Sequence, residues 1–422
     1  MTLNILLINP NRMMDPPVIP IGLEYLKTAL DKHNYSVKIL DLCFKSQPLK
    51  FLNKYLQKET NKPDIIGITI RNIDTSSYFT EEFFLPEIKD LVDYIKKYNI
   101  PIVLGGAGFS ALPSEILEYL GADYGVFGPG EGAFVSLLRD WHQGSIKSRL
   151  YNGWEYKLEQ LVHYRGNDIN YSKYIPNEGI LGFELKKGCN NKCPYCIESD
   201  KPVLYKRIDN VIEEIRYLVD QGYNHFHLCD SEFNLNLKHS IDFCKSIIDN
   251  EIKMKWALYM KPVPYNKELF KLLHESNAYL ITLSVDSYKK IQKLNNYSYN
   301  DLNKIINYCK EYKIKLAIDL LCGYPGESKE SIEEVIKFFK NNRPNTVGIT
   351  FYYRIYRTPL SRLIKKHPEY HKKLTRKLKE NENFLNPIFF ANYNVDFFNA
   401  LIEGDDLFRI AGVKPGVNYQ LD

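Results

Sequence analysis

The feature that most constrains the fold of this 422-residue chain is an alternation of short β-rich runs with amphipathic stretches, in two separate series. In the first series, the predicted strands are Leu3–Asn9, Ser36–Leu42, Ile65–Ile70, Ile102–Leu104 and Tyr124–Phe127. The helical patterns between and after them lie near Gly22–Lys32, Leu49–Gln57, Glu87–Tyr98, Pro113–Leu120 and Glu131–Trp141. Strands that alternate with helices form a parallel sheet covered on both faces. We therefore predict an α/β domain over residues 1–142, built on a doubly wound parallel sheet.

The predicted strands of this first series end in unusual loops. The four loops are Pro10–Pro20, Arg71–Asp74, Gly105–Gly108 and Gly128–Gly132, and each is rich in Gly, Pro or polar residues. Open parallel sheets bind ligands beyond the carboxyl ends of their strands. Four such loops on one edge indicate a floor for a large, flat ligand.

Residues 143–178 show little periodicity, and we predict a linker that packs through Trp154, Tyr156 and Tyr164. The second series follows, with predicted strands Ile180–Leu185, His225–Cys229, Lys255–Tyr259, Tyr279–Leu283, Leu316–Leu321 and Thr346–Phe351. Its clearest helical patterns are Asn210–Gln221, Asn300–Tyr312 and Ser328–Asn341. Six βα-type units predict a partial (βα)6 barrel of the TIM type over residues 179–360, with its chemistry at the carboxyl ends of the strands. Residues 361–422 are predicted to form a small C-terminal cap.

Three of the eight cysteines are bunched as Cys189-Asn-Asn-Lys-Cys193-Pro-Tyr-Cys196, directly after the first strand of the second series. Thiolates suit iron–sulfur clusters or zinc. Three cysteines leave one iron of a four-iron cube without a local protein ligand, and an open metal site can hold a substrate or cofactor. The alternative is a Cys₃His zinc site with His225 or His227 as fourth ligand, although a second cysteine pair is missing. Core packing is the favoured interpretation of both histidines.

The CxxxCxxC motif, with aromatic Tyr195 before its last cysteine and at the end of a first barrel strand, resembles that of the radical S-adenosylmethionine (SAM) enzymes. The resemblance implies a [4Fe-4S] cluster held by Cys189, Cys193 and Cys196. It also implies that SAM chelates the fourth iron through its amino and carboxylate groups. An electron from the cluster would then cleave SAM to a 5′-deoxyadenosyl radical.

Four later segments resemble, in order, segments of this family. They are Cys229–Asn234, Ser284–Ser287, Gly323–Glu327 and Tyr353–Leu360. The resemblance implies contacts with the amino acid, ribose and adenine of SAM. The implied cofactor-binding residues are Tyr195, Asp230, Glu232, Ser284, Asp286, Gly323, Pro325 and Arg354. Tyr353 is a candidate catalytic residue that could line a substrate pocket.

The first 142 residues resemble the cobalamin-binding (B12-binding), Rossmann/flavodoxin-like domain that one branch of this family carries. Thr69-Ile-Arg71 stands where that branch has Ser-x-Leu, and Gly105-Gly106 where it has paired glycines. The implied cobalamin-binding residues are Thr69, Ile70, Arg71, Asn72, Gly105, Gly106, Gly108 and Gly130. The Asp-x-His-x-x-Gly motif is absent, so we do not expect a histidine ligand below the cobalt. The alternative is a flavodoxin-like sheet that has lost cobalamin and only scaffolds the barrel.

The Arg71-Asn-Ile-Asp74 segment resembles that of the subgroup containing the tryptophan C2-methyltransferase. We predict that Arg71 is a catalytic residue that lies beneath the cobalt without coordinating it. A cation there would keep water and other ligands off the lower face and make the cobalt easier to reduce. The alternative is that Arg71 bonds a corrin amide or a local carboxylate.

The resemblance as a whole implies a cobalamin-dependent radical SAM methyltransferase. Such an enzyme transfers a methyl group from SAM, through methylcobalamin, to a carbon of a small-molecule substrate, by a radical or a polar route. An external electron donor of the flavodoxin or ferredoxin type is implied as a partner. A rearrangement or cyclisation without methyl transfer is the first alternative, and a non-catalytic cobalamin or cluster sensor is the second.

Composition excludes other classes of protein. Lys and Arg total 56 against 51 Asp and Glu, a net charge of +5, which is too mild and dispersed to indicate nucleic acid or membrane partners. No apolar run reaches the roughly 18 residues of a membrane-spanning helix, and Leu3–Ile8 is too short for a signal peptide. We therefore expect a cytoplasmic protein. The basic stretch from Lys365 to Arg376 is interpreted as a solvated face, and Asp405, Asp406 and Arg409 as surface ion-pairing residues rather than substrate ligands.

Overall fold

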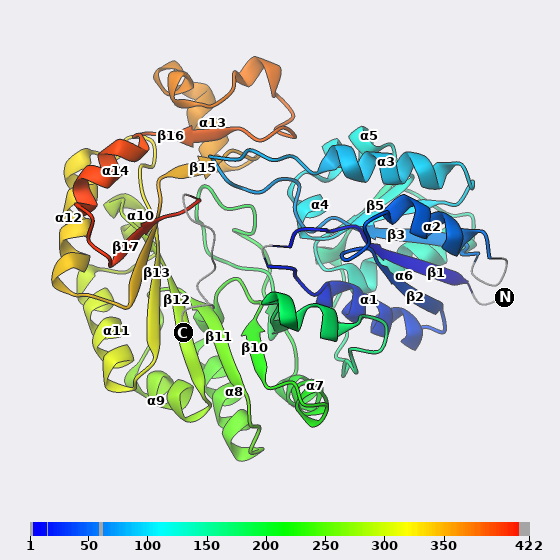
Figure 1. The fold of residues 1–422 in the computed structure, drawn as a ribbon, viewed down its shortest axis with the longest axis horizontal. Coiled ribbons are helices and arrows are strands. Elements are labelled where there is room, and N and C mark those ends of the chain that lie inside the picture. Colours follow the sequence, from blue (N-terminus) through cyan, green and yellow to red (C-terminus); the bar gives the residue numbers. More distant parts are fainter. Residues whose placement is uncertain (1–2, 15, 59–61, 413–422) are drawn as a thin grey trace. The chain divides into compact units, whose positions relative to one another are not determined.

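The computed structural model describes residues 3–14, 16–58 and 62–412, and its chain divides into two compact units (Figure 1). The first unit comprises residues 1–76 and 81–180, and the second comprises residues 77–80 and 181–422. Within the described ranges, no helix is both long and apolar enough to cross a membrane.

The first unit is built on a parallel six-stranded sheet in the order β2-β1-β3-β4-β5-β6. Its strands are β1 (Asn4–Asn9), β2 (Ser36–Asp41), β3 (Ile65–Thr69), β4 (Ile102–Gly105), β5 (Tyr124–Phe127) and β6 (Leu150–Asn152). Its helices are α1 (Ile21–Lys32), α2 (Pro48–Leu56), α3 (Leu85–Lys96), α4 (Ala107–Ala111), α5 (Pro113–Leu120) and α6 (Gly130–His142). Residues 5–8 of β1 are at most 2% exposed, because a central parallel strand is buried on both faces. The predicted doubly wound sheet is confirmed.

The predicted linker is part of this first unit and supplies the sixth strand, which sequence analysis did not predict. At three residues, β6 is too short to show a periodic pattern. After it, Gly153 lies so close to Pro129 that an added Cβ would be 1.9 Å from the Pro129 carbonyl oxygen. Trp154 packs against Gly128, and Tyr156 against Gly132, while Tyr164 is 54% exposed.

A buried ion pair fastens the end of this segment to α1. Glu24 on α1 lies 3.6 Å from Arg165, whose side chain is fully buried. The Glu24 carboxylate also accepts hydrogen bonds from the Gly166 amide at 2.8 Å and the Tyr171 hydroxyl at 2.5 Å. Because both charges are paired and hydrogen-bonded, they can be buried without a prohibitive desolvation cost. The 3-10 turns of this segment are η2 (Gly153–Glu155), η3 (Tyr171–Lys173) and η4 (Ile175–Asn177).

The second unit is a partial barrel, as predicted, whose seven strands are parallel and ordered β17-β14-β13-β12-β11-β10-β7. They are β7 (Leu181–Phe183), β10 (His225–Leu228), β11 (Lys255–Met260), β12 (Ala278–Asp286), β13 (Lys315–Leu321), β14 (Thr346–Thr350) and β17 (Phe408–Ile410). The seventh strand, β17, comes from the segment predicted to be a cap. Its three residues gain strand geometry only by pairing with β14.

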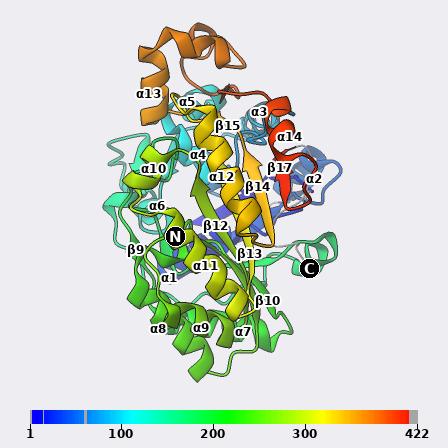
Figure 2. The same cartoon turned by 90° about the vertical axis from the view of Figure 1, so that its left-hand side faces the viewer.

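Helices cover the outer side of this sheet, as α11 and α12 do in front of β13 and β14 in Figure 2. The helices are α7 (Ile208–Asp220), α8 (Leu237–Asp249), α9 (Lys267–Glu275), α10 (Lys289–Leu294), α11 (Tyr299–Glu311), α12 (Lys329–Asn341), α13 (Pro359–Lys366) and α14 (Val395–Ile402). Two antiparallel pairs, β8 (Lys186–Lys187) with β9 (Leu204–Tyr205) and β15 (Tyr352–Arg354) with β16 (Phe389–Ala391), complete the unit. Its 3-10 turns are η5 (Phe233–Leu235), η6 (Pro368–Lys373) and η7 (Leu378–Glu380).

The loop after β3 contributes its tip to the second unit. Its base is closed by a bridge between Asp74 and Phe83, and residues 77–80 belong to the barrel unit. There the Tyr78 ring stacks on Tyr352, with ring centroids 5.5 Å apart, and meets Phe351 edge-on. Residues 77–80 are therefore held by ring contacts within the barrel unit.

Candidate cofactor sites

The three bunched cysteines lie in one closed loop, residues 188–201, which we call the cluster loop. The β8–β9 pair closes its base, and the amide of Lys201 donates to the Cys189 carbonyl at 2.9 Å. Gly188 opens the loop with a φ of +82°, a conformation that glycine adopts without a Cβ penalty. The loop follows β7, the first barrel strand, as predicted for an active-site position.

The cluster-loop thiols are free, and they lie near enough to affect one another. Cys189 is buried, whereas Cys193 and Cys196 are half-buried. Burial, with a further contribution from Asp286 and Cys196, raises the pKa of Cys193 to about 12. Burial likewise raises the pKa of Cys196 to about 11. Such thiols stay protonated until a metal cation binds. The metal then replaces the proton, because the thiolate is the form that ligates it.

The geometry differs from that of a single-ion site. In the described ranges, no three or more His, Cys, Asp or Glu side chains are grouped to hold one metal ion. Ligands of a four-iron cube bind different irons and therefore need no common point. The two histidines of the zinc alternative contact tyrosine rings instead, His225 with Tyr279 and His227 with Tyr259. Burial lowers the pKa of His227 to about 4, which keeps its ring neutral.

Two predicted acidic residues lie at the ends of β10 and β12: Asp230 contacts the residues that lead into the cluster loop, and Asp286 contacts the loop itself. Asp230 accepts from the amide of Leu185 at 2.9 Å and lies 3.6 Å from the buried Lys186. Asp286 accepts from the Tyr195 hydroxyl of the cluster loop at 2.7 Å. Burial raises the pKa of Asp286 to about 7, against the opposing effect of the Tyr195 hydrogen bond. These contacts bring three of the predicted site residues, Tyr195, Asp230 and Asp286, to one edge of the barrel sheet.

Glu232 and Ser284 form a second pair at the same edge. Burial raises the pKa of Glu232 to about 7, while a hydrogen bond from Ser284 and the charges of Lys186 and Lys261 act in the opposite direction. A buried carboxylate with a strongly raised pKa at the end of a barrel strand is a candidate functional residue. The structure thus brings together the predicted acidic and serine residues.

Lys261 is a site residue that sequence analysis missed. It follows β11 directly, and its ammonium donates to Asn191 of the cluster loop at 2.7 Å. Burial lowers the pKa of Lys261, although Cys189, Glu232 and Cys193 act in the opposite direction. Its position directly after the third barrel strand could have identified it, since active-site residues of barrels lie at the carboxyl ends of strands. Sequence analysis assigned no site residue to that strand end.

The Gly323–Glu327 turn is closed by its own glutamate. The Glu327 carboxylate accepts from the Gly323 amide at 2.7 Å, the Tyr324 amide at 3.2 Å and the Ser287 hydroxyl at 2.6 Å. Gly323 has a φ of +79°, and Pro325 is buried, so both shape this turn. Their predicted contact with the cofactor stays a prediction.

Arg354 and Tyr353 lie side by side on β15 with different surroundings. The Arg354 guanidinium donates to the carbonyls of Ile355, Phe384 and Leu385, so it fastens the C-terminal segment. Its predicted cofactor contact is not among these bonds and stays a prediction. Tyr353 is 4% exposed, and its ring lies 5.3 Å from that of Tyr195 and edge-on to Tyr324. It is therefore adjacent to the cluster loop.

In the first unit, the strand order reverses between β1 and β3, the point at which such sheets bind ligands. The loops that begin with Pro10 and Arg71 leave the sheet on the two sides of this point. Beside them, the side-chain amide of Asn9 donates to the Asp41 carboxylate at 2.9 Å, and the Tyr174 hydroxyl donates to the same carboxylate at 2.8 Å. The predicted floor therefore has a rigid, hydrogen-bonded margin.

The predicted cobalamin-binding glycines have two distinct environments. A Cβ on Gly106 would lie 2.6 Å from the Ile70 carbonyl oxygen and 2.7 Å from the Thr69 hydroxyl, and one on Gly108 would lie 3.0 Å from the Arg71 backbone. These two glycines let the end of β4 pack on the end of β3. Gly130, at the start of α6, faces open space, where a helix N-terminus favours anionic groups such as phosphate.

Arg71 is exposed at the carboxyl end of β3 and is braced by its neighbour. With its amide correctly oriented, Asn72 donates to the Arg71 carbonyl at 2.9 Å and accepts from the Arg71 guanidinium at 3.2 Å. The guanidinium that sequence analysis placed beneath the cobalt is thus held by the next residue of its own loop. Thr69 is half-buried, and Ile70 is buried.

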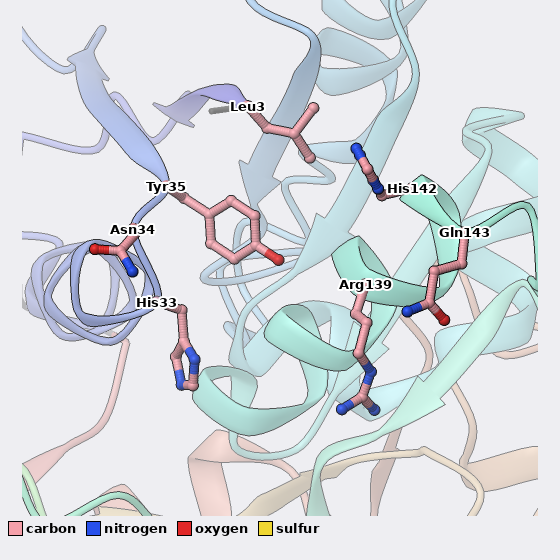
Figure 3. Close-up of a pocket in the computed structure, with 7 residues that line it drawn as sticks. All are labelled: Leu3, His33, Asn34, Tyr35, Arg139, His142 and Gln143. Carbon is pink, nitrogen blue, oxygen red and sulfur yellow. The ribbon is translucent and has the colours of Figure 1, made fainter. Parts of the chain in front are cut away.

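A hollow of about 450 Å³ lies at the opposite edge of this sheet (Figure 3). Its lining comes from Leu3 before β1, the turn His33–Tyr35 after α1, and the end of α6 with Arg139, His142 and Gln143. Leu3 and Tyr35 precede β1 and β2, so this hollow is at the amino ends of the strands and is separate from the predicted cofactor floor.

The residues fit the implied cofactors on structural grounds. The cluster loop offers three free thiols, with the carboxylate of Asp286 close enough to affect the pKa of Cys193. In the first unit, the start of α6 at Gly130 is open. Gly106 and Gly108 permit close backbone packing beside Arg71, whose guanidinium is held by Asn72. Both sets lie at the carboxyl ends of parallel strands.

Comparison with known proteins agrees with this division. The B12 binding domain family matches residues 14–138, and the radical SAM superfamily matches residues 183–339. The tryptophan 2-C-methyltransferase of Streptomyces laurentii is 24% identical, over 78% of this chain and 69% of the relative. The cytidylyl-2-hydroxyethylphosphonate methyltransferase of Streptomyces wedmorensis is 21% identical, over 78% and 75%.

A solved structure has the same fold. The radical SAM methyltransferase TsrM from Kitasatospora setae, with cobalamin and a [4Fe-4S] cluster bound, has a TM-score of 0.86 at 23% identity, over 97% of this chain and 93% of that chain. The same enzyme with tryptophan and a SAM analogue bound has a TM-score of 0.87 at 22% identity, over 99% and 93%. The chain therefore belongs to the radical SAM enzymes that carry an N-terminal B12-binding domain, and it is homologous to tryptophan 2-C-methyltransferase.

Proposed function

We propose that this protein is a cobalamin-dependent radical SAM methyltransferase that adds a methyl group to a carbon of a small molecule. The observation that carries the proposal is that one chain combines a three-cysteine loop at the head of a barrel with a B12-binding sheet. When bound, the cluster supplies an electron, SAM supplies the methyl group, and cobalamin carries it. The chain's residues hold and orient these groups.

Within the barrel unit, we assign the roles by position. Cys189, Cys193 and Cys196 would hold the iron–sulfur cluster. Glu232 follows β10 and Asp286 ends β12, at the same edge of the barrel sheet, where carboxylates can accept hydrogen bonds from the amino group and ribose hydroxyls of SAM. Tyr195 orients Asp286 through its hydroxyl.

Arg71 would act beneath the cobalt of cobalamin. Its guanidinium is a weak metal ligand that cannot be deprotonated in proteins, so it would exclude water without coordinating the cobalt. The hydrogen bond that the guanidinium donates to the Asn72 side chain supports this role, because it restricts the guanidinium. Replacing Arg71 with Lys or Ala should alter the visible spectrum of bound cobalamin; an unchanged spectrum with unchanged activity would contradict this role.

The substrate is proposed to be a small molecule, with tryptophan the first to test. Two observations support this choice: the relatives named for tryptophan, and the buried rings of Tyr353 and Tyr324 beside the cluster loop. Aromatic pairs favour offset or edge-on contacts, which an indole could extend. An external electron donor of the flavodoxin or ferredoxin type would be needed, and the free cysteines favour the reducing cytoplasm.

The test is anaerobic reconstitution of the full chain with iron, sulfide and hydroxocobalamin, followed by metal analysis and assay with tryptophan. We expect about four irons per chain, one cobalt, and a product heavier by one methylene unit. The Cys193→Ser variant should lose iron and activity but keep cobalt. Iron without cobalt would refute the cobalamin role, and a substrate consumed without gain of mass would favour rearrangement over methylation.

A further inference from the structure

The barrel unit carries an unusually concentrated positive charge in residues 357–379. This stretch contains nine Lys or Arg and one Glu, a net charge of +8, whereas the whole chain carries only +5 and the rest therefore −3. Eight of the nine cations are exposed: Arg357, Arg362, Lys365, Lys366, Lys372, Arg376, Lys377 and Lys379. The sequence analysis interpreted this stretch as a solvated face, but its position in the structure indicates more.

The basic stretch contacts the cluster loop. The amide of Leu360, in the first turn of α13, donates to the Pro194 carbonyl at 2.9 Å, and Pro194 lies between Cys193 and Cys196. Two exposed cations, Arg357 and Arg362, lie within three residues of this hydrogen bond. Figure 1 shows α13 and the segment after it standing out from the barrel sheet beside β15 and β16.

A second basic segment, α10, ends at a residue that adjoins a contact with the same loop. It carries the exposed residues Lys289, Lys290 and Lys293. Directly after it, the side-chain amide nitrogen of Asn295 lies 3.7 Å from the Cys193 sulfur. The last residue of α10, Leu294, is 54% exposed.

The two basic segments are neighbours. A Cβ placed on Gly326 would lie 3.6 Å from the hydroxyl of Tyr370 in η6 and 3.8 Å from that of Tyr288, which precedes α10. Figure 2 shows α10 and α13 on the same side of the barrel unit. We call the exposed cations of residues 357–379 and α10, with Leu294, the basic surface.

We propose that the basic surface is the docking site for a small acidic one-electron carrier, of the flavodoxin or ferredoxin class, that reduces the cluster. This inference rests on the proposed function, because it requires a cluster in the loop. One electron leaves the reduced carrier and enters the cluster, so the carrier is oxidised by one electron, and no bond forms or breaks.

Three features of the surface fit this partner. Cations steer an acidic protein to the surface and raise its association rate. Electron-transfer complexes use small interfaces, and the basic surface carries the exposed apolar residue Leu294 among its charges. Leu360 of the first basic segment and Asn295 directly after the second contact the cysteine loop itself, so a docked carrier would have a short path to the cluster. A nucleic acid would also bind cations but would gain nothing from proximity to the cluster loop.

The test compares two charge-reversal variants of the reconstituted full chain that have the same net charge. The first carries Lys290→Glu, Lys366→Glu and Lys372→Glu on the basic surface. The matched control carries Lys253→Glu, Lys304→Glu and Lys310→Glu, three exposed residues of the same unit outside this surface. Binding of an acidic flavodoxin is measured by titration, and cluster reduction by rapid mixing with the reduced flavodoxin.

We expect the surface variant to bind flavodoxin at least roughly tenfold more weakly than the wild type, and its cluster to be reduced at least roughly tenfold more slowly. The control should change little in both measurements. Raising the salt from about 0.01 M to about 1 M shortens the screening length from about 30 Å to about 3 Å and should abolish the difference. Chemical reduction by dithionite should be equal in all three proteins. That equality separates docking from cluster assembly.

Two outcomes would overturn the docking site. Equal flavodoxin binding and reduction by both variants would remove it while leaving the proposed function intact. So would salt-sensitive binding of a duplex RNA that the surface variant loses, with unchanged reduction by flavodoxin. Failure of the wild type to take up iron would refute the proposed function instead.

Discussion

Gly106 provides the sharpest test of how the cobalamin-binding unit is built. Its backbone has φ +98° and ψ 169°, a region that essentially only glycine occupies. An added Cβ would also lie 2.6 Å from the Ile70 carbonyl oxygen and 2.9 Å from the Ile70 amide nitrogen. These are backbone atoms, so no side-chain rotation can relieve the contact.

The expected destabilisation of Gly106→Ala follows from two costs. The unfavourable dihedral angles cost about 1–3 kcal/mol. Overpacking against a fixed backbone costs about 1–3 kcal/mol more. We therefore expect the free energy of unfolding of the first unit to fall by about 3 kcal/mol, with Thr69–Arg71 displaced.

The matched control is Gly130→Ala, because a Cβ there meets nothing within 4 Å and the residue opens α6. This control should be neutral or more stable by about 0.4–1 kcal/mol. Urea unfolding of the cofactor-free full chain measures the change, and hydrogen exchange in β3 and β4 locates it. If Gly106→Ala unfolded within about 0.5 kcal/mol of the wild type, the argument from backbone contact would be wrong.

Two further predictions concern buried charges. Glu24→Ala should destabilise the first unit by about 3–5 kcal/mol, because it leaves the buried Arg165 charge uncompensated. Urea unfolding measures the change, and Arg343→Ala, which breaks an exposed ion pair, is the control, with an expected loss below about 1 kcal/mol. A loss as small as that in Glu24→Ala would contradict the prediction. The second concerns Glu184, whose pKa is about 2 because Lys187 and Lys206 outweigh the opposing effect of burial. This depressed pKa stabilises the fold above about pH 4.5, the ordinary pKa of the group, and the stabilisation, about 3 kcal/mol, is lost as the pH falls through about 2. Urea midpoints between about pH 5 and pH 3 should therefore fall less in Glu184→Gln than in the wild type, and identical slopes would refute the assignment.

Much of the fold could be predicted from the sequence because long parallel strands and their helices have strong periodic patterns. The five strands predicted for the first unit and the six for the barrel match β1–β5, β7 and β10–β14 closely. Six strands were missed, and all are two or three residues long: β6 and β17 pair only at the edge of a large sheet, and β8, β9, β15 and β16 form two-stranded pairs. Their strand geometry comes from a neighbour, so local sequence carries too little of it.

The candidate sites divide in the same way. The three cysteines could be placed from their bunching after a predicted strand, and the acidic residues from the family resemblance; parallel strands bring their carboxyl ends to one edge. Lys261 could not be placed in this way, since a single lysine has no pattern of its own and its bond to Asn191 joins residues 70 apart in the sequence.

The sequence alone therefore determined the order of elements, the cysteine loop and the family, because these depend on local periodicity and spacing. Tertiary structure alone decided three things that depend on distant contacts. Residues 143–178 belong to the first unit because Gly166 bonds Glu24 and Gly153 packs against Pro129. Gly106 and Gly108 serve backbone packing because β3 ends against them. The basic stretch after Tyr356 acquires a proposed role only because Leu360 bonds Pro194 beside the cysteines.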